Sequence, residues 1–315
     1  MTTYIVRRVL LVVPTLAFAF TAVFILLRLI PGDAVTVLFS NGQYSKQDYQ
    51  EFRHQLGIDQ SIPVQYGKFA TQIVTGDFGK SIFSGRQVLP EFFQNRLSIT
   101  VELTVFAVVF GLLLGIPAGV AAALKHDSVI DHIVRSVAIG GLAIPGFWIA
   151  TLVLVLPSHW WHWAPPLGYK SFFEAPGKHL EEVLIPSFIM SIALAAALMR
   201  MTRAMMLEVL RQDFVRTARA KGLHSNAIIV RHALRNAMIP LVSVLGVQVA
   251  VLISGTVIFE TIFSLPGVGS YLFQGVTRRD YPVVQVVAVF LTVGVALINL
   301  LVDLSYPLID PRVRV

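Results

Sequence analysis

Residues 103–124 read LTVFAVVFGLLLGIPAGVAAAL and contain no charged side chain. A helix needs about 20 mostly apolar residues to cross the hydrocarbon core of a bilayer, so this stretch is long enough to span a membrane. Glycines recur in it at Gly111, Gly115 and Gly119, and small residues permit the close approach of a neighbouring helix. The stretch therefore predicts a membrane-spanning helix within a helical bundle.

Five further stretches of this kind lie along the chain, at 9–27, 136–157, 183–199, 237–259 and 283–302. The one at 183–199 is short and would have to continue through Arg200 and Arg203, whose long side chains can snorkel. Of the 315 residues, 55% are hydrophobic and 14% are charged, against roughly 25% charged in an average chain. The sequence predicts an all-α integral membrane protein with six transmembrane helices. It contains no cysteine, which excludes disulfides and thiol chemistry.

The first of these stretches could also be a secretory signal peptide. Arg7 and Arg8 resemble the positively charged N-terminal region of a signal peptide, and residues 17–19 (AFA) resemble its cleavage site. The apolar run continues past that site to Leu27, which favours a retained helix. We therefore expect a first transmembrane helix within residues 1–30.

The basic residues are divided unequally between the two sides that six spans would create. The side with the N-terminus has fourteen Lys or Arg and five Asp or Glu, whereas the other side has ten of each. Lys and Arg are enriched in cytoplasmic loops, so this excess predicts that both termini lie in the cytoplasm. The formal net charge of +7 then follows from topology, and we expect no nucleic-acid partner.

The predicted outer segment, residues 31–96, is much longer than an ordinary connection of about 4–6 residues. Its helix-like stretches and the expected breaks are 50–56, Gly57, Pro63, 65–74 and Gly76. These features predict a small folded cap on the outer face. Residues 76–81 (GDFGKS) resemble the end of a phosphate-binding loop, but that motif requires a glycine where the chain has Val74.

The predicted inner segment, residues 200–236, carries eight Lys or Arg and reads QDFVRTARAKG at 212–222. The small residues Ala218 and Ala220, followed by Gly222, predict a helix that ends at the glycine. Ser225 is a suitable cap for a second helix. The apolar positions expected along that helix are Ile228, Ile229, Ala233 and Leu234. The segment thus predicts a basic helix–turn–helix hairpin beneath the membrane.

Three interpretations of this hairpin remain open from the residues alone. It could be a loop that only keeps positive charge inside, or a patch that binds anionic lipid. It could instead be a docking surface for a soluble protein. The small residues and the glycine turn suit close approach to another protein, whereas the first two interpretations need only charge.

The hairpin resembles the cytoplasmic EAA loop of ABC importer permeases, which follows the pattern EAA-x3-G-x9-I-x-LP. Residues 216–218 (RTA) take the place of the triplet, Gly222 that of the glycine, and His232 and Leu234 those of the Ile and Leu, while Arg235 replaces the proline. The sequence RTARAKGL at 216–223 is typical of the oligopeptide/dipeptide/nickel subfamily. Similar stretches cover nearly the whole chain, at 7–33, 56–66, 76–81, 259–269, 279–285, 299–303 and 310–312.

The resemblance implies a permease subunit of an ATP-driven importer in the bacterial cytoplasmic membrane. Its default cargo is peptides, and nickel complexes and glutathione-like molecules remain open as alternatives. Its implied partners are a sister permease, two ABC ATPases, an extracytoplasmic substrate-binding protein and membrane lipid. ATP and Mg would be bound by the ATPases, and this chain would bind no cofactor or metal. The implied regions are 1–30, 31–96, 97–306 with the loop 200–236, and a tail at 307–315.

The same resemblance implies that the hairpin is the helix that couples the permease to the ATPase. The residues expected in this contact are Arg216, Thr217, Ala218, Arg219, Lys221, Gly222 and Leu234. In the spans, Glu102, Glu260 and Asp303 are costly charges that either pair between helices or face a path. Asn299 lies one helical turn before Asp303, so these two are candidates for a translocation path.

Other functional classes are less well supported by the sequence. An ion-coupled secondary transporter, the main alternative, typically shows internal repeats and central ionisable residues, whereas the charges here lie near the ends of the spans. An intramembrane hydrolase would need a nucleophile and base at membrane depth, and no GxSxG or HExxH pattern is present. His159 and His162 could suggest a metal, but their place among three Trp favours an interfacial belt. We therefore expect no enzymatic activity in this chain.

Overall fold

The computed structural model describes the backbone of residues 2–39 and 45–309, and the side chains of 13–39, 45–238 and 240–305. Within these ranges the regular structure is helical, apart from one isolated bridge between Lys80 and Gln87. The side chains of Arg7 and Arg8, and the last part of the predicted tail with Asp310, Arg312 and Arg314, lie outside the described residues.

The chain forms two compact units, and the first comprises Met1–Ile99 and Pro266–Ala296. Its helices are α1 (Thr2–Leu29), α2 (Ala34–Leu38), α3 (Lys46–Gln55), α4 (Ile62–Thr75), α5 (Val88–Glu91), the π-helical turn η1 (Phe92–Arg96), α13 (Val268–Arg278) and the first part of α14 (Tyr281–Ile309). A buried cluster around Phe78, Phe92 and Val286 holds this unit together.

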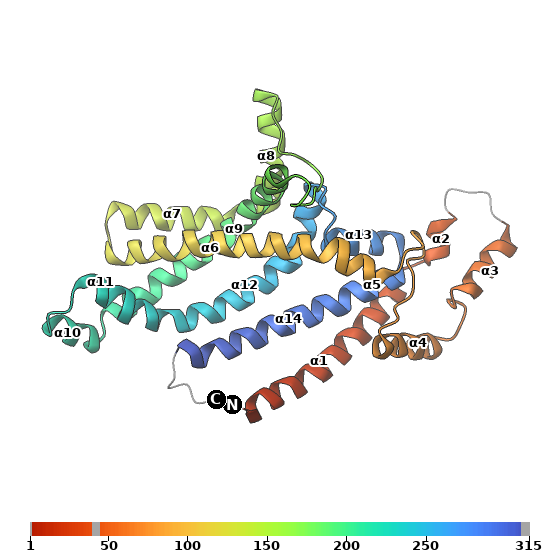
Figure 1. Ribbon diagram of the computed structural model, residues 1–315, viewed down its shortest axis with the longest axis horizontal. Helices are drawn as coiled ribbons and strands as arrows, with labels where there is room; N and C mark the ends of the chain where they lie inside the picture. Colours follow the sequence, from red (N-terminus) through yellow and green to blue (C-terminus); the bar gives the residue numbers. More distant parts are fainter. Residues whose placement is uncertain (1, 40–44, 310–315) are drawn as a thin grey trace. The chain divides into compact units, whose positions relative to one another are not determined.

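The second unit comprises Thr100–Leu265 and Leu297–Val315. Its helices are α6 (Leu97–Leu124), α7 (Val129–Ala143), α8 (Gly146–Trp161), α9 (Pro176–Leu210), α10 (Asp213–Ala220), α11 (Ser225–Ala227), the π-helix η2 (Ile228–Leu234), α12 (Arg235–Ile262) and the last part of α14. The long helix α9 packs against α7, α8 and α12 (Figure 1).

Four helices of the described chain are long and apolar enough to cross a membrane: Val88–Leu124, Pro176–Leu210, Pro240–Ile262 and Tyr281–Ser305. Helices α7 and α8 are long and apolar enough to cross a membrane only when they are counted as one span, which gives up to five spans. The apolar part of α1, Val13–Leu29, is shorter. The membrane-spanning character is thus confirmed, while the count of six stays a prediction.

The span predicted at 136–157 is wrong as one continuous helix. The chain is bent by 90° between α7 and α8, where Ile144 is extended and Pro145 precedes the new helix. Proline has no N–H to continue a helix and disfavours helical geometry in the residue before it, which explains the break. Pro117 and Pro186, by contrast, lie inside continuous helices.

The close helix contact predicted from the glycines of 103–124 is confirmed. A side chain at Gly115 would place its Cβ 2.6 Å from Leu198 Cβ and 2.9 Å from the carbonyl oxygen of Ala195, both in α9. Gly111 and Gly119 face α9 with equally little space. Three glycines on one face of α6 therefore allow the backbones of α6 and α9 to approach closely.

The segment 31–96 contains helices, as expected, but one of its expected breaks is wrong. Gly57 and Gly76 adopt left-handed conformations directly after α3 and at the end of α4. Pro63 instead lies in the first turn of α4, where a missing N–H costs no hydrogen bond. The helix that ends at Leu124 also starts earlier than predicted, at Val88 through η1.

Candidate functional site

The basic hairpin, residues 213–234, has a small apolar core of its own. Val215, Ala218 and Ile228 are buried against one another, with Leu210 at the end of α9 packed beside them. Val215 and Ala218 are separated by one helical turn and so point to the same side of α10. Ala218 was predicted to contact a partner, but here it forms part of the hairpin's interior.

The turn of the hairpin is closed by Gly222, which has a φ of +77°. Its N–H donates to the carbonyl of Arg219 at 2.9 Å, and the N–H of Leu223 donates to that of Ala218 at 3.2 Å. These two bonds form a Schellman motif, which requires a left-handed residue after the helix. Among the described residues, no atom outside the chain neighbours lies within 4 Å of a Cβ built at Gly222, so the glycine is needed here for its backbone conformation.

The second helix of the hairpin begins differently from the prediction. Its cap is His224, whose side chain accepts from the N–H of Asn226 at 3.4 Å, and Ser225 is already the first helical residue. Farther along, Ala233 is buried with Met206 and Ala237, and Leu234 packs against this cluster. Leu234, which is half-buried, therefore connects the hairpin to the helices behind it.

The outward face of the hairpin combines cations with apolar side chains. Its exposed residues include Phe214, Arg216, Thr217, Arg219, Lys221, Gly222 and Leu223, together with the acidic Asp213. Arg216 makes an exposed contact of 3.5 Å with Asp213. Across the described chain, no acidic group lies within salt-bridge distance of Arg219 or Lys221. This face could receive a partner that offers acidic groups around an apolar patch.

Behind the hairpin, α9 is fixed to α7 by a buried ion pair that the sequence analysis missed. Arg203 donates through Nε and Nη2 to the two carboxylate oxygens of Asp131, with Nη2–Oδ2 at 2.8 Å. Asp131 is fully buried, and Arg135 approaches it at 3.7 Å. Arg203 was expected to snorkel, but it instead neutralises a carboxylate 72 positions away.

The same corner contains the only group of His, Asp and Glu in the described residues that could hold a metal ion. It consists of His126, Asp127 and Asp131, whose ligand atoms lie within 4.8 Å of one another. Both oxygens of Asp131 already accept hydrogen bonds from Arg203. A cation here would have to displace that ion pair, so the arrangement is better suited to holding the helices together.

The other charged residues singled out in the spans have structural neighbours in the second unit. Glu260 is fully buried and accepts from the Thr100 hydroxyl at 2.7 Å, and Glu102 lies 3.1 Å from His179 Nε2. These contacts match pairing between elements. In α14, Asn299 is exposed and Asp303 is half-buried. His179, the neighbour of Glu102, is a buried residue of the long helix α9.

Comparison with known proteins assigns this architecture to a family. A family model described as the binding-protein-dependent transport system inner membrane component matches residues 115–315, and a model of the corresponding N-terminal component matches 1–104. The chain belongs to this family. As a permease of this kind it is a multi-pass membrane protein and one subunit of a larger ABC importer complex.

Curated relatives match this permease over its full length. The di/tripeptide transport system permease protein DppB of Pseudomonas aeruginosa is 38% identical, with 100% of this chain and 99% of that protein covered. The dipeptide transport system permease protein DppB of Escherichia coli K12 is 36% identical, with coverage of 99% and 98%. The subfamily inferred from the motif at 216–223 is therefore confirmed.

Among solved structures, this permease is similar to a chain of the inward-facing MetNI methionine ABC transporter. The TM-score is 0.53 at 19% identity, over 68% of this chain and 94% of that chain. Likeness at this identity shows a shared fold. Together with the family match, it supports the ABC permease over an ion-coupled secondary transporter.

Proposed function

We propose that this permease carries di- or oligopeptides across a bacterial cytoplasmic membrane, driven by ATP that partner subunits hydrolyse. The hairpin 213–234 carries the proposal, because its apolar core is turned inward while Arg219, Lys221 and Leu223 are turned outward. A loop that only kept positive charge on one side would need neither this core nor a glycine-closed turn. The relatives named as di/tripeptide and dipeptide permeases support the choice of cargo.

The proposed complex contains this chain, a sister permease, two ABC ATPases and an extracytoplasmic substrate-binding protein. The hairpin seats on an ATPase, and both termini lie in the cytoplasm, as the excess of Lys and Arg on that side favours. ATP and Mg are bound by the ATPases, and this chain itself binds no cofactor. Arg216, Arg219 and Lys221 supply charged contacts, while Gly222 sets the direction of the turn.

Asn299 and Asp303 are the proposed contribution of α14 to the translocation path. They lie one turn apart, so they share a face of the helix, and neither is fully buried. Polar side chains inside a bilayer are costly and usually face a cavity or a partner. A path for peptides of varied sequence needs only a few such groups.

The proposal is tested by purifying the tagged chain from membranes, identifying its partners by mass spectrometry and measuring ATP hydrolysis. We expect a sister permease and two ATPases, with hydrolysis stimulated by a peptide-loaded binding protein. A chain that purifies alone and moves solute along an ion gradient would contradict the proposal. Uptake of labelled peptide into reconstituted vesicles then tests the cargo separately.

A further inference from the structure

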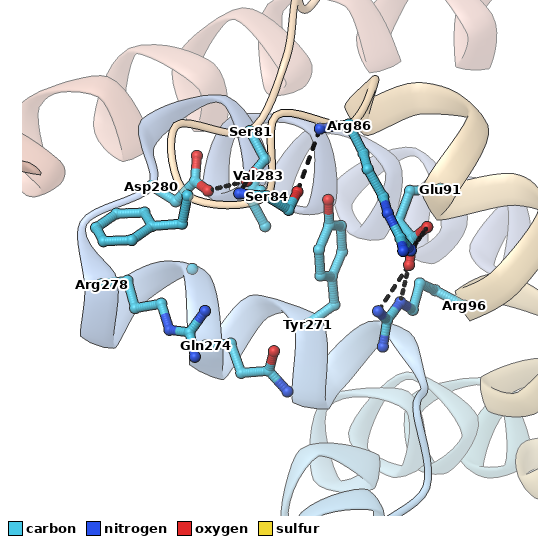
Figure 2. A pocket seen from close by; sticks show the side chains of 12 residues that line it. Ser81, Ser84, Arg86, Glu91, Arg96, Tyr271, Gln274, Arg278, Asp280 and Val283 are labelled. Carbon is cyan, nitrogen blue, oxygen red and sulfur yellow. Dashed lines mark hydrogen bonds and ion pairs between the residues drawn. The ribbon is translucent and has the colours of Figure 1, made fainter. Parts of the chain in front are cut away.

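The first unit contains a polar cavity of about 90 Å³ between α13, the loop 79–88 and the beginning of the long helix at Val88 (Figure 2). Three arginines line it, namely Arg86, Arg96 and Arg278. The acidic groups in the lining are Glu91 and Asp280. The cavity wall thus carries one more positive than negative charge.

Helix α13 supplies one wall through residues at helical spacing. Tyr271, Gln274, Gly275 and Arg278 all line the cavity, and their spacing places them on one face of the helix. In Figure 2, the side chain of Tyr271 extends from α13 toward Ser84 and Arg86, while those of Gln274 and Arg278 lie along the helix. At Gly275 a Cβ would lie 2.9 Å from Val283 Cγ1, so the glycine lets α13 pack closely on α14.

Both acidic groups already form hydrogen bonds or ion pairs with neighbouring residues of the cavity wall. Glu91 accepts from Arg96 Nε at 2.9 Å and Nη2 at 2.7 Å, and Arg86 lies 3.5 Å from its other oxygen. Asp280 is 3% exposed and accepts from the Ser81 hydroxyl and from the N–H of Ile82. These contacts hold the helix 88–124 and the loop 79–88 in place.

Arg278 is different, because its guanidinium retains donors. It is exposed, its guanidinium carbon lies 5.9 Å from the centroid of the Phe83 ring, and no acidic group of the described residues pairs with it. Tyr271 lies on the same face of α13, two helical turns before Arg278. Burial, together with the charges of Asp280 and Glu91, raises the pKa of Tyr271 to about 12, so its hydroxyl keeps its proton and can donate.

We propose that this cavity binds a small carboxylate through Arg278, supported by Tyr271 and Gln274, and that the carboxylate is the free C-terminus of a short peptide. The planar guanidinium presents paired donors that match the two oxygens of a carboxylate. The single excess positive charge suits a monoanion better than a doubly charged phosphate. The carboxylate class rests on the cavity itself, whereas the peptide origin rests on the proposed function.

The test measures binding of trialanine, its C-terminal amide, acetate and inorganic phosphate to the full chain purified with its native subunits. We expect the free acid to bind and the amide to bind at least tenfold more weakly. Arg278→Gln should weaken binding of the free acid by at least tenfold. Arg278→Lys keeps the charge but loses the planar guanidinium, so its affinity should lie between those of the original chain and Arg278→Gln. Lys46→Gln, which removes an exposed charge of the same unit away from the cavity, should change nothing.

Equal binding of the acid and the amide would overturn the proposal, as would tighter binding of phosphate or equal affinities of Arg278→Gln and Lys46→Gln. If acetate binds in an Arg278-dependent manner but trialanine does not, the carboxylate site stands and its peptide origin is overturned. Because binding is measured without transport, a failure of peptide uptake leaves this result interpretable. The two proposals can therefore fail independently.

Discussion

The hairpin of the second unit and the cavity of the first are both rich in arginine, yet they use it in opposite ways. In the hairpin, apolar side chains are enclosed and the cations are exposed on the outside. In the cavity, the cations surround a hollow and are held by Glu91 and by aromatic rings. The number of arginines therefore does not tell a protein-docking surface from a pocket for a small anion. The two differ in whether the arginines are exposed on the outside of an element or line a cavity.

The energetic roles of the charges differ in the same way. The Arg216–Asp213 pair has side chains that are 77% and 94% exposed. Exposed ion pairs of this kind contribute about 1 kcal/mol or less to the stability of the fold. Glu91 has a side chain that is only 9% exposed and accepts two hydrogen bonds from Arg96. Removing a hairpin charge should therefore affect binding alone, whereas removing Glu91 should also affect folding.

The largest expected effect concerns Arg203, whose ion-pair partner Asp131 is fully buried. Asp131→Asn leaves its guanidinium beside a neutral amide, and loss of one partner of a buried ion pair costs about 3–5 kcal/mol. The free energy of unfolding in detergent measures the loss. Asp127→Asn is the matched control, because the Asp127 side chain is 72% exposed and should change stability little.

Replacing both partners sharpens this result. Asp131→Asn combined with Arg203→Met removes the stranded charge and should recover much of the stability, because a packed apolar pair can match a buried ion pair. Equal losses in Asp131→Asn and Asp127→Asn would show that the buried pair contributes nothing.

The second prediction removes the hairpin's interior without touching its surface. Ile228 is 2% exposed, whereas Val230 in the same helix is 63% exposed. Ile228→Ala should destabilise the hairpin by roughly 2 to 4 kcal/mol, and Val230→Ala should not. Hydrogen exchange of residues 213–234 measures the local opening. If exchange is unchanged in Ile228→Ala, the core of the hairpin does not hold its surface in shape.

The comparison also shows which features the sequence could predict. The spans, the hairpin and the turn at Gly222 follow from local signals, namely apolar runs, helical spacing and a glycine after a helix. The close contact along Gly111, Gly115 and Gly119 follows from their spacing as well. These features depend on residues that are near one another in the chain.

The missed features depend on residues that are far apart. Asp131 and Arg203 are separated by 72 positions, and Ser81 and Asp280 by 199, so no local pattern pairs them. Ala218 was expected in the contact with the ATPase, whereas its packing against Ile228 depends on a residue of the other helix of the hairpin. The cavity in the first unit was missed for the same reason.

The third prediction separates the conformation of Gly222 from its surface. Gly222→Val should strain the left-handed turn by about 1 to 2 kcal/mol, leave membrane insertion intact and uncouple ATP hydrolysis from uptake. Gly222→Asn adds a side chain of similar bulk that tolerates this conformation. Normal coupling in Gly222→Asn would show that the glycine serves the turn alone, whereas its loss would show that a partner approaches closely. Normal uptake in Gly222→Val would contradict the coupling role.

The smallest change in stability and the sharpest contrast come from neutralising single exposed cations. Arg219→Gln and Arg278→Gln should each change the free energy of unfolding by less than about 0.5 kcal/mol, as exposed substitutions usually do. Arg219→Gln should weaken association with the ATPase and leave carboxylate binding unchanged, whereas Arg278→Gln should do the reverse. Both variants are measured in both assays. If either variant affects both, the two arginine-rich regions do not act separately, and the distinction between a docking surface and an anion pocket fails.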